Sequence, residues 1–228
     1  MPRLPRIVAG NNVYHIVNRA IGKLSIFNSF DDFNLFISCV KEAQLKLDMR
    51  ILAYCIMPNH WHLLLYPKND SDISLFMHQL TNAHTRKFHL KTQTVGTGPL
   101  YQGRYFSSLV NTDNYVLAVI KYIEQNPLRA RLVLRVEDWQ WSSARLRLTN
   151  INPHAPIITD APISLPSNYH EWVNILENDV NENVRKSIQK GIPFGSDVWV
   201  ENMRFMQKRT VEERRKVKVI HSLVPDPN

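Results

Sequence analysis

The feature that most constrains the fold is a pair of short apolar segments separated by a proline and an asparagine. Residues 53–67 read AYCIMPNHWHLLLYP. The run that starts at His60 is too short for anything but a strand, and residues 51–57 read as another. Pro58-Asn59 between them is a turn signal. We therefore expect a β-hairpin whose second strand starts at His60.

His60 and His62 lie on the same face of this second strand. Side chains alternate across a strand, so both imidazoles project from one face, whereas Trp61 and Leu63 project from the other. Two imidazoles at this spacing can bind one metal ion. The alternative is that one histidine packs and the other is a surface residue, which is the commoner fate of an arbitrary pair. A metal site also needs a further ligand and a group for the metal to activate.

Strand and helix patterns alternate on both sides of the hairpin. Residues 12–17 alternate as a strand, and a helical repeat of apolar residues follows, with Asp31 or Asp32 as its N-cap. After the hairpin, Ser71 or Asp72 caps a second long helix.

A further strand and a third helix follow. Residues 100–110, LYQGRYFSSLV, are predicted as a strand with an irregularity at Gly103. Asp113 caps the third helix, and Pro127 ends it because the residue before a proline is pushed out of the helical region. This order, with hairpin-length connections and two long helices, predicts an α+β sandwich: a central antiparallel sheet with helices packed on one face.

The composition favours a polyanionic partner. The formal net charge is +8, and nucleic acid is the commonest polyanion that such a protein binds. Cys39 and Cys55 lie in apolar segments, which indicates buried free thiols in a reducing compartment. No apolar stretch reaches the roughly 18 residues of a membrane span, and the N-terminus lacks a signal-peptide core. We expect a cytoplasmic protein without a membrane partner.

Three parts are predicted along the chain. Residues 1–149 carry the strands and helices described above and form the main domain. The prolines between 150 and 168 are typical of a linker or an extended strap. Residues 169–228 are predicted as a helical C-terminal extension with a basic tail, which is either a loose helix-turn-helix or an appendage that covers the site.

The third helix offers partners for the histidines. Tyr122 and Asn126 are four residues apart, which is about 40° around a helix. A phenol beside an amide carbonyl, above a sheet with two histidines, can supply a nucleophile and a metal ligand. On this pattern Tyr122 is equally a core-edge tyrosine, and Tyr115, two turns earlier, is a rival.

Six segments carry a resemblance to a known family: YHIVNRA, MPNHWHLLLYP, LYQGRYFSSLV, KYIEQNPLRARLV, WQWSS and IQKGIPFGSDVWVENM. In this order they resemble the single-tyrosine HUH transposases, and among them the REP-associated tyrosine transposases. The resemblance covers residues 12–148, and the C-terminal extension of that branch is also similar here. It implies a ferredoxin-like or RRM-like sandwich with the histidines on a central strand.

The resemblance also implies roles for individual residues. His60 and His62 match the metal ligands, Tyr122 matches the nucleophile, and Asn126 matches the polar third ligand. The implied reaction is metal-dependent cleavage of single-stranded DNA at hairpin-forming repeats, through a 5′-phosphotyrosine that strand transfer reverses. The implied ion is Mg²⁺ or Mn²⁺, although imidazole also suits zinc.

Five further residues are candidates for DNA contacts. His15 is predicted on a strand near the site, where a hydrogen-bonded structural role is as common as a role toward DNA. Arg19, Arg104 and Arg129 are candidates for phosphate contacts, although a single arginine is more often a solvated charge. Tyr105 is a candidate for base stacking, with core packing as the alternative.

Two other functions stay open at this stage. A catalytically silent, domesticated protein of the same fold would bind structured DNA without cutting it. A metal-dependent hydrolase would use water and leave no protein-linked product. Relatives with a minimal catalytic domain form dimers that exchange the tyrosine helix, but the longer chain here favours a monomer, in which the extension holds that helix.

Overall fold

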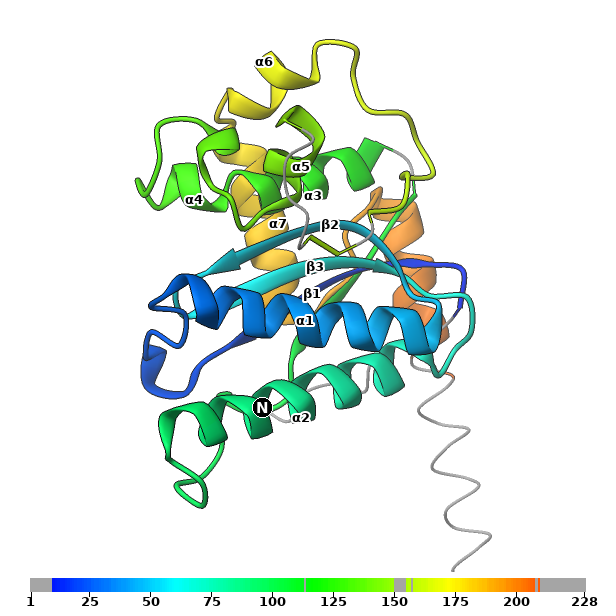
Figure 1. Cartoon of the computed structure of the whole chain (residues 1–228). Coiled ribbons are helices and arrows are strands. Elements are labelled where there is room, and N and C mark those ends of the chain that lie inside the picture. Colours follow the sequence, from blue (N-terminus) through cyan, green and yellow to red (C-terminus); the bar gives the residue numbers. More distant parts are fainter. Residues whose placement is uncertain (1–9, 113, 150–154, 157, 208, 210–228) are drawn as a thin grey trace, which may run out of the picture.

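The computed structural model describes residues 10–112, 114–149, 155–156, 158–207 and 209 (Figure 1). The predicted cap Asp113 and the predicted basic tail lie outside these residues. A helical segment at 197–207 follows the named elements. In chain order the elements are β1 (Val13–Arg19), η1 (Ile21–Lys23), α1 (Phe30–Leu47), β2 (Arg50–Met57), β3 (His60–Tyr66), α2 (Asp72–Thr92), β4 (Phe106–Val110), α3 (Asn114–Glu124), α4 (Asn126–Arg129), η2 (Val136–Asp138), α5 (Ser143–Thr149), α6 (Tyr169–Asn174) and α7 (Asn178–Lys190).

The four strands form one antiparallel sheet in the order β2-β3-β1-β4. The β-α-β-β-α-β succession is that of ferredoxin-like proteins. Met57 pairs with His60 across the turn, which confirms the predicted hairpin. The predicted strand over 100–110 is too long, because Gly103 has a φ of 126° and β4 starts only at Phe106. A single bridge from Tyr101 to Ala20 precedes that bend.

The two long helices, α1 and α2, cover one face of the sheet (Figure 1). Phe36 of α1 and Phe76 of α2 are fully buried in the same core as Trp61 of β3. The sequence pattern predicted Asp31 or Asp32 as the N-cap of α1, and this prediction is wrong, because the N-cap is Ser29. Asp32 is instead the third residue of a capping box, in which its carboxylate accepts from the Ser29 backbone N–H.

The opposite face, which carries His62, is also covered by helices. Its core contains Leu64 of β3, Ile120 of α3 and Val184 of α7, all buried. The α+β sandwich is therefore confirmed, but the predicted placement of helices on one face holds for α1 and α2 alone. The physical reason is that β2 and β3 are apolar on both faces, and both faces must be shielded from water.

Segments of the C-terminal part lie along both edges of the sheet. Beside β2, the Thr159 backbone N–H donates to the Ile51 carbonyl at 2.9 Å. Beside β4, the Phe194 N–H donates to the Leu109 carbonyl at 2.8 Å. These contacts satisfy edge groups that would otherwise be open to pairing with another chain. The described part of 150–168 thus packs as a strap along the sheet.

The two cysteines of the chain, Cys39 and Cys55, are buried and free, as predicted. Within the described ranges, no helix has both the length and the hydropathy of a membrane span.

Candidate active site

Three histidines meet on the face of the sheet that α3 covers. His60 and His62 share that face of β3, and their ring centroids lie 5.1 Å apart. His15 comes from the neighbouring strand β1, and its Nε2 lies 2.9 Å from Nδ1 of His62. His15 and His62 are almost fully buried, whereas His60 is half-buried. Strand pairing therefore brings together residues that the sequence places far apart.

Hydrogen bonds orient the two histidines of β3. Nδ1 of His60 lies 2.7 Å from Oδ1 of Asn59. The Asn59 amide nitrogen donates to the Lys23 carbonyl at 3.2 Å, so its oxygen is the atom that faces the imidazole. Nδ1 of His60 is then the protonated nitrogen, and Nε2 carries the lone pair. Nδ1 of His62 faces Nε2 of His15, so Nε2 is the ring nitrogen of His62 that this contact leaves open. With Nδ1 as the donor in that contact, Nε2 carries the lone pair in both rings and is the nitrogen available to a metal ion.

The three histidines are neutral near pH 7. Burial, with the charges of Arg19 and Arg129, lowers the pKa of His60 to about 4. Burial, with the neighbouring histidines, holds the pKa of His62 well below its usual value. The pKa of His15 falls to about 3, mainly through burial. Neutral imidazole is the form that binds metal ions.

A metal held by this pair needs oxygen ligands as well. Among the residues that the structure describes, no group of three or more histidine, cysteine, aspartate or glutamate side chains is arranged to hold a metal ion. Two neutral imidazoles therefore fit a metal site that an amide oxygen or a substrate oxygen completes. Such a mixed set suits Mg²⁺ or Mn²⁺ better than an all-nitrogen site does.

Tyr122 of α3 packs against this histidine cluster. Its ring meets His15 edge-on, with centroids 5.7 Å apart, and meets His62 at 5.9 Å. The side chain is only 7% exposed. Burial raises the pKa of Tyr122, and the charges of Arg129 and Arg185 oppose that rise. The rival tyrosine, Tyr115, has its ring against Phe194.

Asn126 follows a break in the tyrosine helix. Helix α3 ends at Glu124, before the predicted end at Pro127, and α4 begins at Asn126. Pro127 lies in the first turn of α4, where its missing N–H is tolerated. The Asn126 amide nitrogen donates to the carbonyls of Tyr122 and Ile123, at 3.1 and 3.0 Å. Its Oδ1 is therefore the atom that remains for a ligand.

Arg129 lies on Tyr122. Its guanidinium carbon is 4.1 Å from the centre of the phenol ring, and its Nη2 donates to the Tyr122 carbonyl at 2.8 Å. Its Nη1 donates to Oδ1 of Asn181 in α7 at 3.3 Å. The sequence predicted a phosphate contact for Arg129, but in the structure this side chain is directed at the tyrosine.

The other predicted DNA contacts lie at different depths. Arg19 pairs with His60 in the sheet and its charge acts on that imidazole, so it stands at the same end of the sheet as the site. Arg104 is exposed in the bend before β4. Tyr105 is buried in the core under α1 and α2, which fits the packing alternative rather than base stacking.

Sequence reasoning missed Glu124, which follows Tyr122 by two residues. Its carboxylate is fully buried and accepts from Ser143 at 2.5 Å, from Arg147 at 3.1 Å and from Tyr169 of α6. The available signal was a glutamate at the end of a largely apolar helical stretch, YVLAVIKYIE. A charge at such a position requires buried partners.

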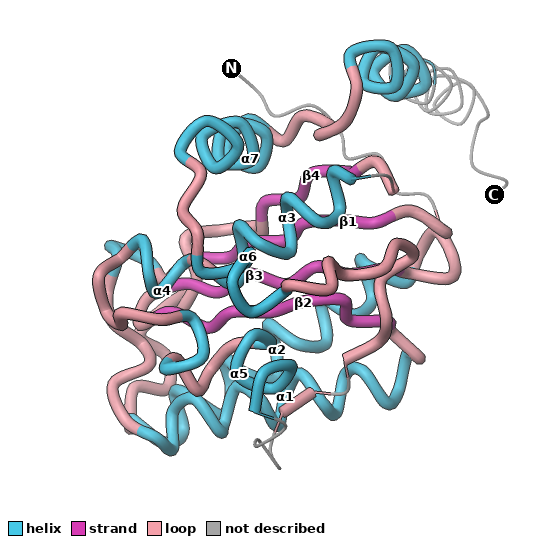
Figure 2. The backbone as a smooth tube through the Cα atoms, turned by 90° about the horizontal axis from the view of Figure 1, so that it is seen from above, coloured by secondary structure: helices cyan, strands magenta, loops and turns pink. Residues whose placement is uncertain are grey.

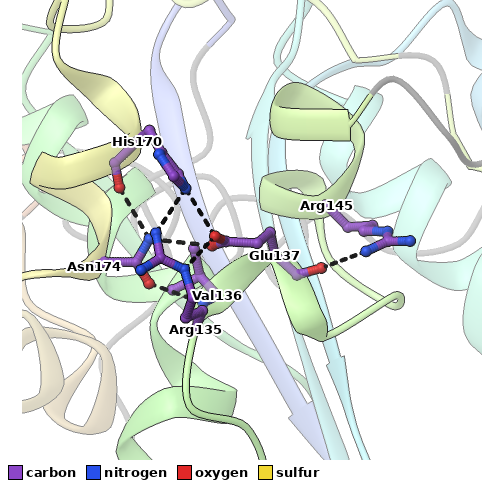
Figure 3. A network of polar contacts seen from close by, with 6 residues as sticks. All are labelled: Arg135, Val136, Glu137, Arg145, His170 and Asn174. Atoms are coloured by element: carbon purple, nitrogen blue, oxygen red, sulfur yellow. Dashed lines mark hydrogen bonds and ion pairs between the residues drawn. The ribbon is translucent and has the colours of Figure 1, made fainter.

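A second polar network attaches α6 to the segment after α4 (Figure 3). Glu137 accepts from Asn174 at 3.1 Å and lies 2.8 Å from Nε2 of His170. The Asn174 oxygen accepts from the Val136 backbone N–H at 3.0 Å. The C-terminal part is thus bound to the tyrosine helix and to the chain that follows it.

The chain is similar to known proteins in sequence and in fold. The family described as transposase IS200 like matches residues 9–126, which include His15, the β3 histidines, Tyr122 and Asn126. A curated Haemophilus influenzae protein that carries the name REP-associated tyrosine transposase is 29% identical over 121 residues, which cover 50% of this chain and 69% of that protein. A solved structure of a REP-associated tyrosine transposase bound to a REP hairpin superposes with a TM-score of 0.57 at 19% identity. The match covers 73% of this chain and 100% of the other, and it shows a shared fold.

Proposed function

The chain belongs to the IS200-like transposase family. We propose that it cuts and rejoins single-stranded DNA with Tyr122 as the nucleophile. The substrate we propose is a hairpin-forming repeat. Support comes from the Haemophilus relative, which is named for REP sequences, and from the solved relative, which holds a REP hairpin. The net charge of +8 is suited to a DNA partner.

The observation that carries the proposal is the contact between Tyr122 and the histidine cluster. The phenol ring lies 5.9 Å from His62 and 5.7 Å from His15, although the chain positions are far apart. A tyrosine packed against a neutral imidazole that we propose as a metal ligand, His62, is the pairing that nucleophilic attack on a phosphodiester needs.

His60 and His62, through Nε2, and Asn126, through Oδ1, are the residues we propose to hold a Mg²⁺ or Mn²⁺ ion. When bound, such an ion polarises a non-bridging oxygen of the scissile phosphate. His15 would fix the orientation of His62 through the bond to Nδ1. Asn59 would do the same for His60.

The reaction exchanges one phosphodiester for another. The Tyr122 oxygen forms a bond to phosphorus, the bond to the 3′ oxygen breaks, and the phenol proton ends on the released 3′-hydroxyl. Because a diester is lost and a diester is formed, the step is reversible, and a second 3′-hydroxyl can take the strand from the tyrosine. A buried, protonated phenol is a weak nucleophile, so the phosphate must be held in line with it.

The test is to incubate the protein with end-labelled hairpin DNA and Mn²⁺ and to look for a covalent adduct on a denaturing gel. We expect an adduct from the native protein and from Tyr115→Phe, and none from Tyr122→Phe. No adduct from the native protein, or an adduct that persists in Tyr122→Phe, contradicts the proposal. If the DNA is cleaved without forming an adduct, and if Tyr122→Phe still cleaves it, the protein is a hydrolase that uses water.

A second candidate function is DNA binding without cleavage. The observation that favours it is the small exposed fraction of Tyr122, 7%, beneath the Arg129 guanidinium. In that case the native protein binds the hairpin but forms no adduct with either Mg²⁺ or Mn²⁺.

A further inference from the structure

A series of hydrogen bonds connects the C-terminal part to the turn after Tyr122. It begins at Gln125, which is fully buried. The Gln125 amide nitrogen donates to the carbonyls of Val173 and Ile175, both at 2.8 Å. Its oxygen accepts from the Asn181 amide nitrogen at 3.3 Å. The two carbonyls can only accept, so they set the orientation of both amides.

The same series continues from Asn181 to the tyrosine. Because the Asn181 nitrogen points to Gln125, its oxygen points to Arg129 and accepts from Nη1 at 3.3 Å. The other guanidinium nitrogen, Nη2, donates to the Tyr122 carbonyl at 2.8 Å. Every group from the Val173 carbonyl to Tyr122 has a partner of the right kind, so the arrangement is defined in direction as well as in distance.

The guanidinium and the histidines enclose the phenol ring. Arg129 covers a face of the ring at 4.1 Å from its centre, while His15 and His62 meet it at 5.7 and 5.9 Å. A cation over the face of an aromatic ring is favourable and stronger where water is excluded. Asn181 itself is only 9% exposed, so its bond to Arg129 is shielded from water.

We propose that Arg129 is a positioning residue for Tyr122, and that Asn181 of α7 holds Arg129 in that place. The C-terminal helix α7, which lies beside α3 (Figure 2), is then part of the active site. The proposal rests on the proposed role of Tyr122 as nucleophile. Arg129 acts by holding the ring where its oxygen meets the phosphate in line, and it does not bind the DNA backbone.

The first experiment measures adduct formation and DNA affinity separately. Arg129→Lys keeps the charge but loses the planar fork that reaches both the Tyr122 carbonyl and Asn181. In single-turnover reactions at saturating hairpin DNA with Mn²⁺, we expect its adduct rate to fall about tenfold or more. Asn181→Ala should give a smaller fall, and the double variant should be no slower than Arg129→Lys, since both act through one contact.

The DNA dissociation constant distinguishes positioning from phosphate binding. For both variants we expect it to stay within about threefold of the native value, because no phosphate contact is removed. The matched controls are Arg86→Lys and Asn82→Ala, two exposed positions on α2, and they should leave rate and affinity unchanged. Affinity that weakens in step with the rate, or a double variant whose losses multiply, would overturn the proposal.

A second measurement does not depend on catalysis. The protein labelled with 3-fluorotyrosine gives a ¹⁹F resonance for Tyr122, identified by its loss in Tyr122→Phe. We expect this resonance to move in Arg129→Lys and in Asn181→Ala and to stay in place in both α2 controls. An unmoved resonance refutes the contact even if the native protein forms adducts. If the native protein forms none, the proposed function fails, and the ¹⁹F shifts alone decide whether Arg129 positions the ring.

Discussion

Replacing Glu124 by glutamine tests the buried ion pair that anchors the tyrosine helix. The Glu124 side chain is 0% exposed and that of Arg147 is 12% exposed, with 3.1 Å between the Glu124 oxygen and the Arg147 nitrogen. Glutamine keeps the size of the side chain and removes its charge. Arg147 is then left as a buried cation without its counter-ion, which costs about 3 to 5 kcal/mol when one partner of such a pair is removed.

The assay is equilibrium unfolding in urea, followed by circular dichroism. The matched control is Glu42→Gln, which breaks the Lys87–Glu42 pair between side chains that are 29% and 52% exposed. We expect the control to cost less than about 1 kcal/mol, because water screens exposed pairs. A third variant, Glu124→Gln with Arg147→Met, removes both buried charges.

The double variant supplies the decisive comparison. Its cost should be smaller than the sum of the costs of Glu124→Gln and of Arg147→Met, measured as a fourth variant, by about 2 kcal/mol, because no buried charge is left uncompensated. If Glu124→Gln costs no more than Glu42→Gln, or if the two single costs add in the double variant, the carboxylate does not stabilise the fold through Arg147. The anchoring of α3 would then rest on apolar packing and on hydrogen bonds such as those that Glu124 accepts from Ser143 and Tyr169.

Three further outcomes are expected. Asn59→Ala frees the ring of His60, so we expect the affinity for Mn²⁺, measured by calorimetry, to fall about tenfold. An unchanged affinity would exclude Asn59 as the group that orients this ligand. In the metal-free protein His15 takes up its proton near pH 3 when folded but near 6.5 when unfolded, so its contribution to stability is complete above pH 6.5 and lost as the pH falls toward 3. As the pH falls from 6.5 toward 3, the free energy of unfolding in urea should therefore decrease more steeply in the native protein than in His15→Gln, by about 1.4 kcal/mol per pH unit. Equal slopes in the two proteins would contradict the burial argument. Light scattering should give a monomer near 26.6 kDa, since Gln125 and Asn181 hold α3 on its own sheet, and a dimer would refute this.

Local periodicity was enough to predict the hairpin and the shared face of its histidines. Alternation along a strand depends only on neighbouring residues, so the direction of His60 and His62 follows from their spacing. The same holds for the succession of elements and for the two buried thiols. End points were less accurate, as Ser29 and the start of β4 show, because a cap or a bend depends on side-chain bonds and on backbone angles.

Contacts between distant segments were not predictable in this way. The strand order places His15 beside His62, and the choice of sheet face for α3 places Tyr122 against both. The resemblance of single segments pointed to these residues, but it implied no role for Glu124 or Asn181 and no contact between Arg129 and the tyrosine. Their roles depend on where the C-terminal helices pack.

The sequence by itself determined the strands, the helices and the direction of the histidine pair, because each follows from the period of one element. Tertiary structure alone decided what surrounds Tyr122. A long side chain such as Arg129 has many rotamers, and only the partners that converge on it from α3 and α7 select one of them. The same convergence gives the buried Glu124 its donors, and no spacing along the chain encodes it.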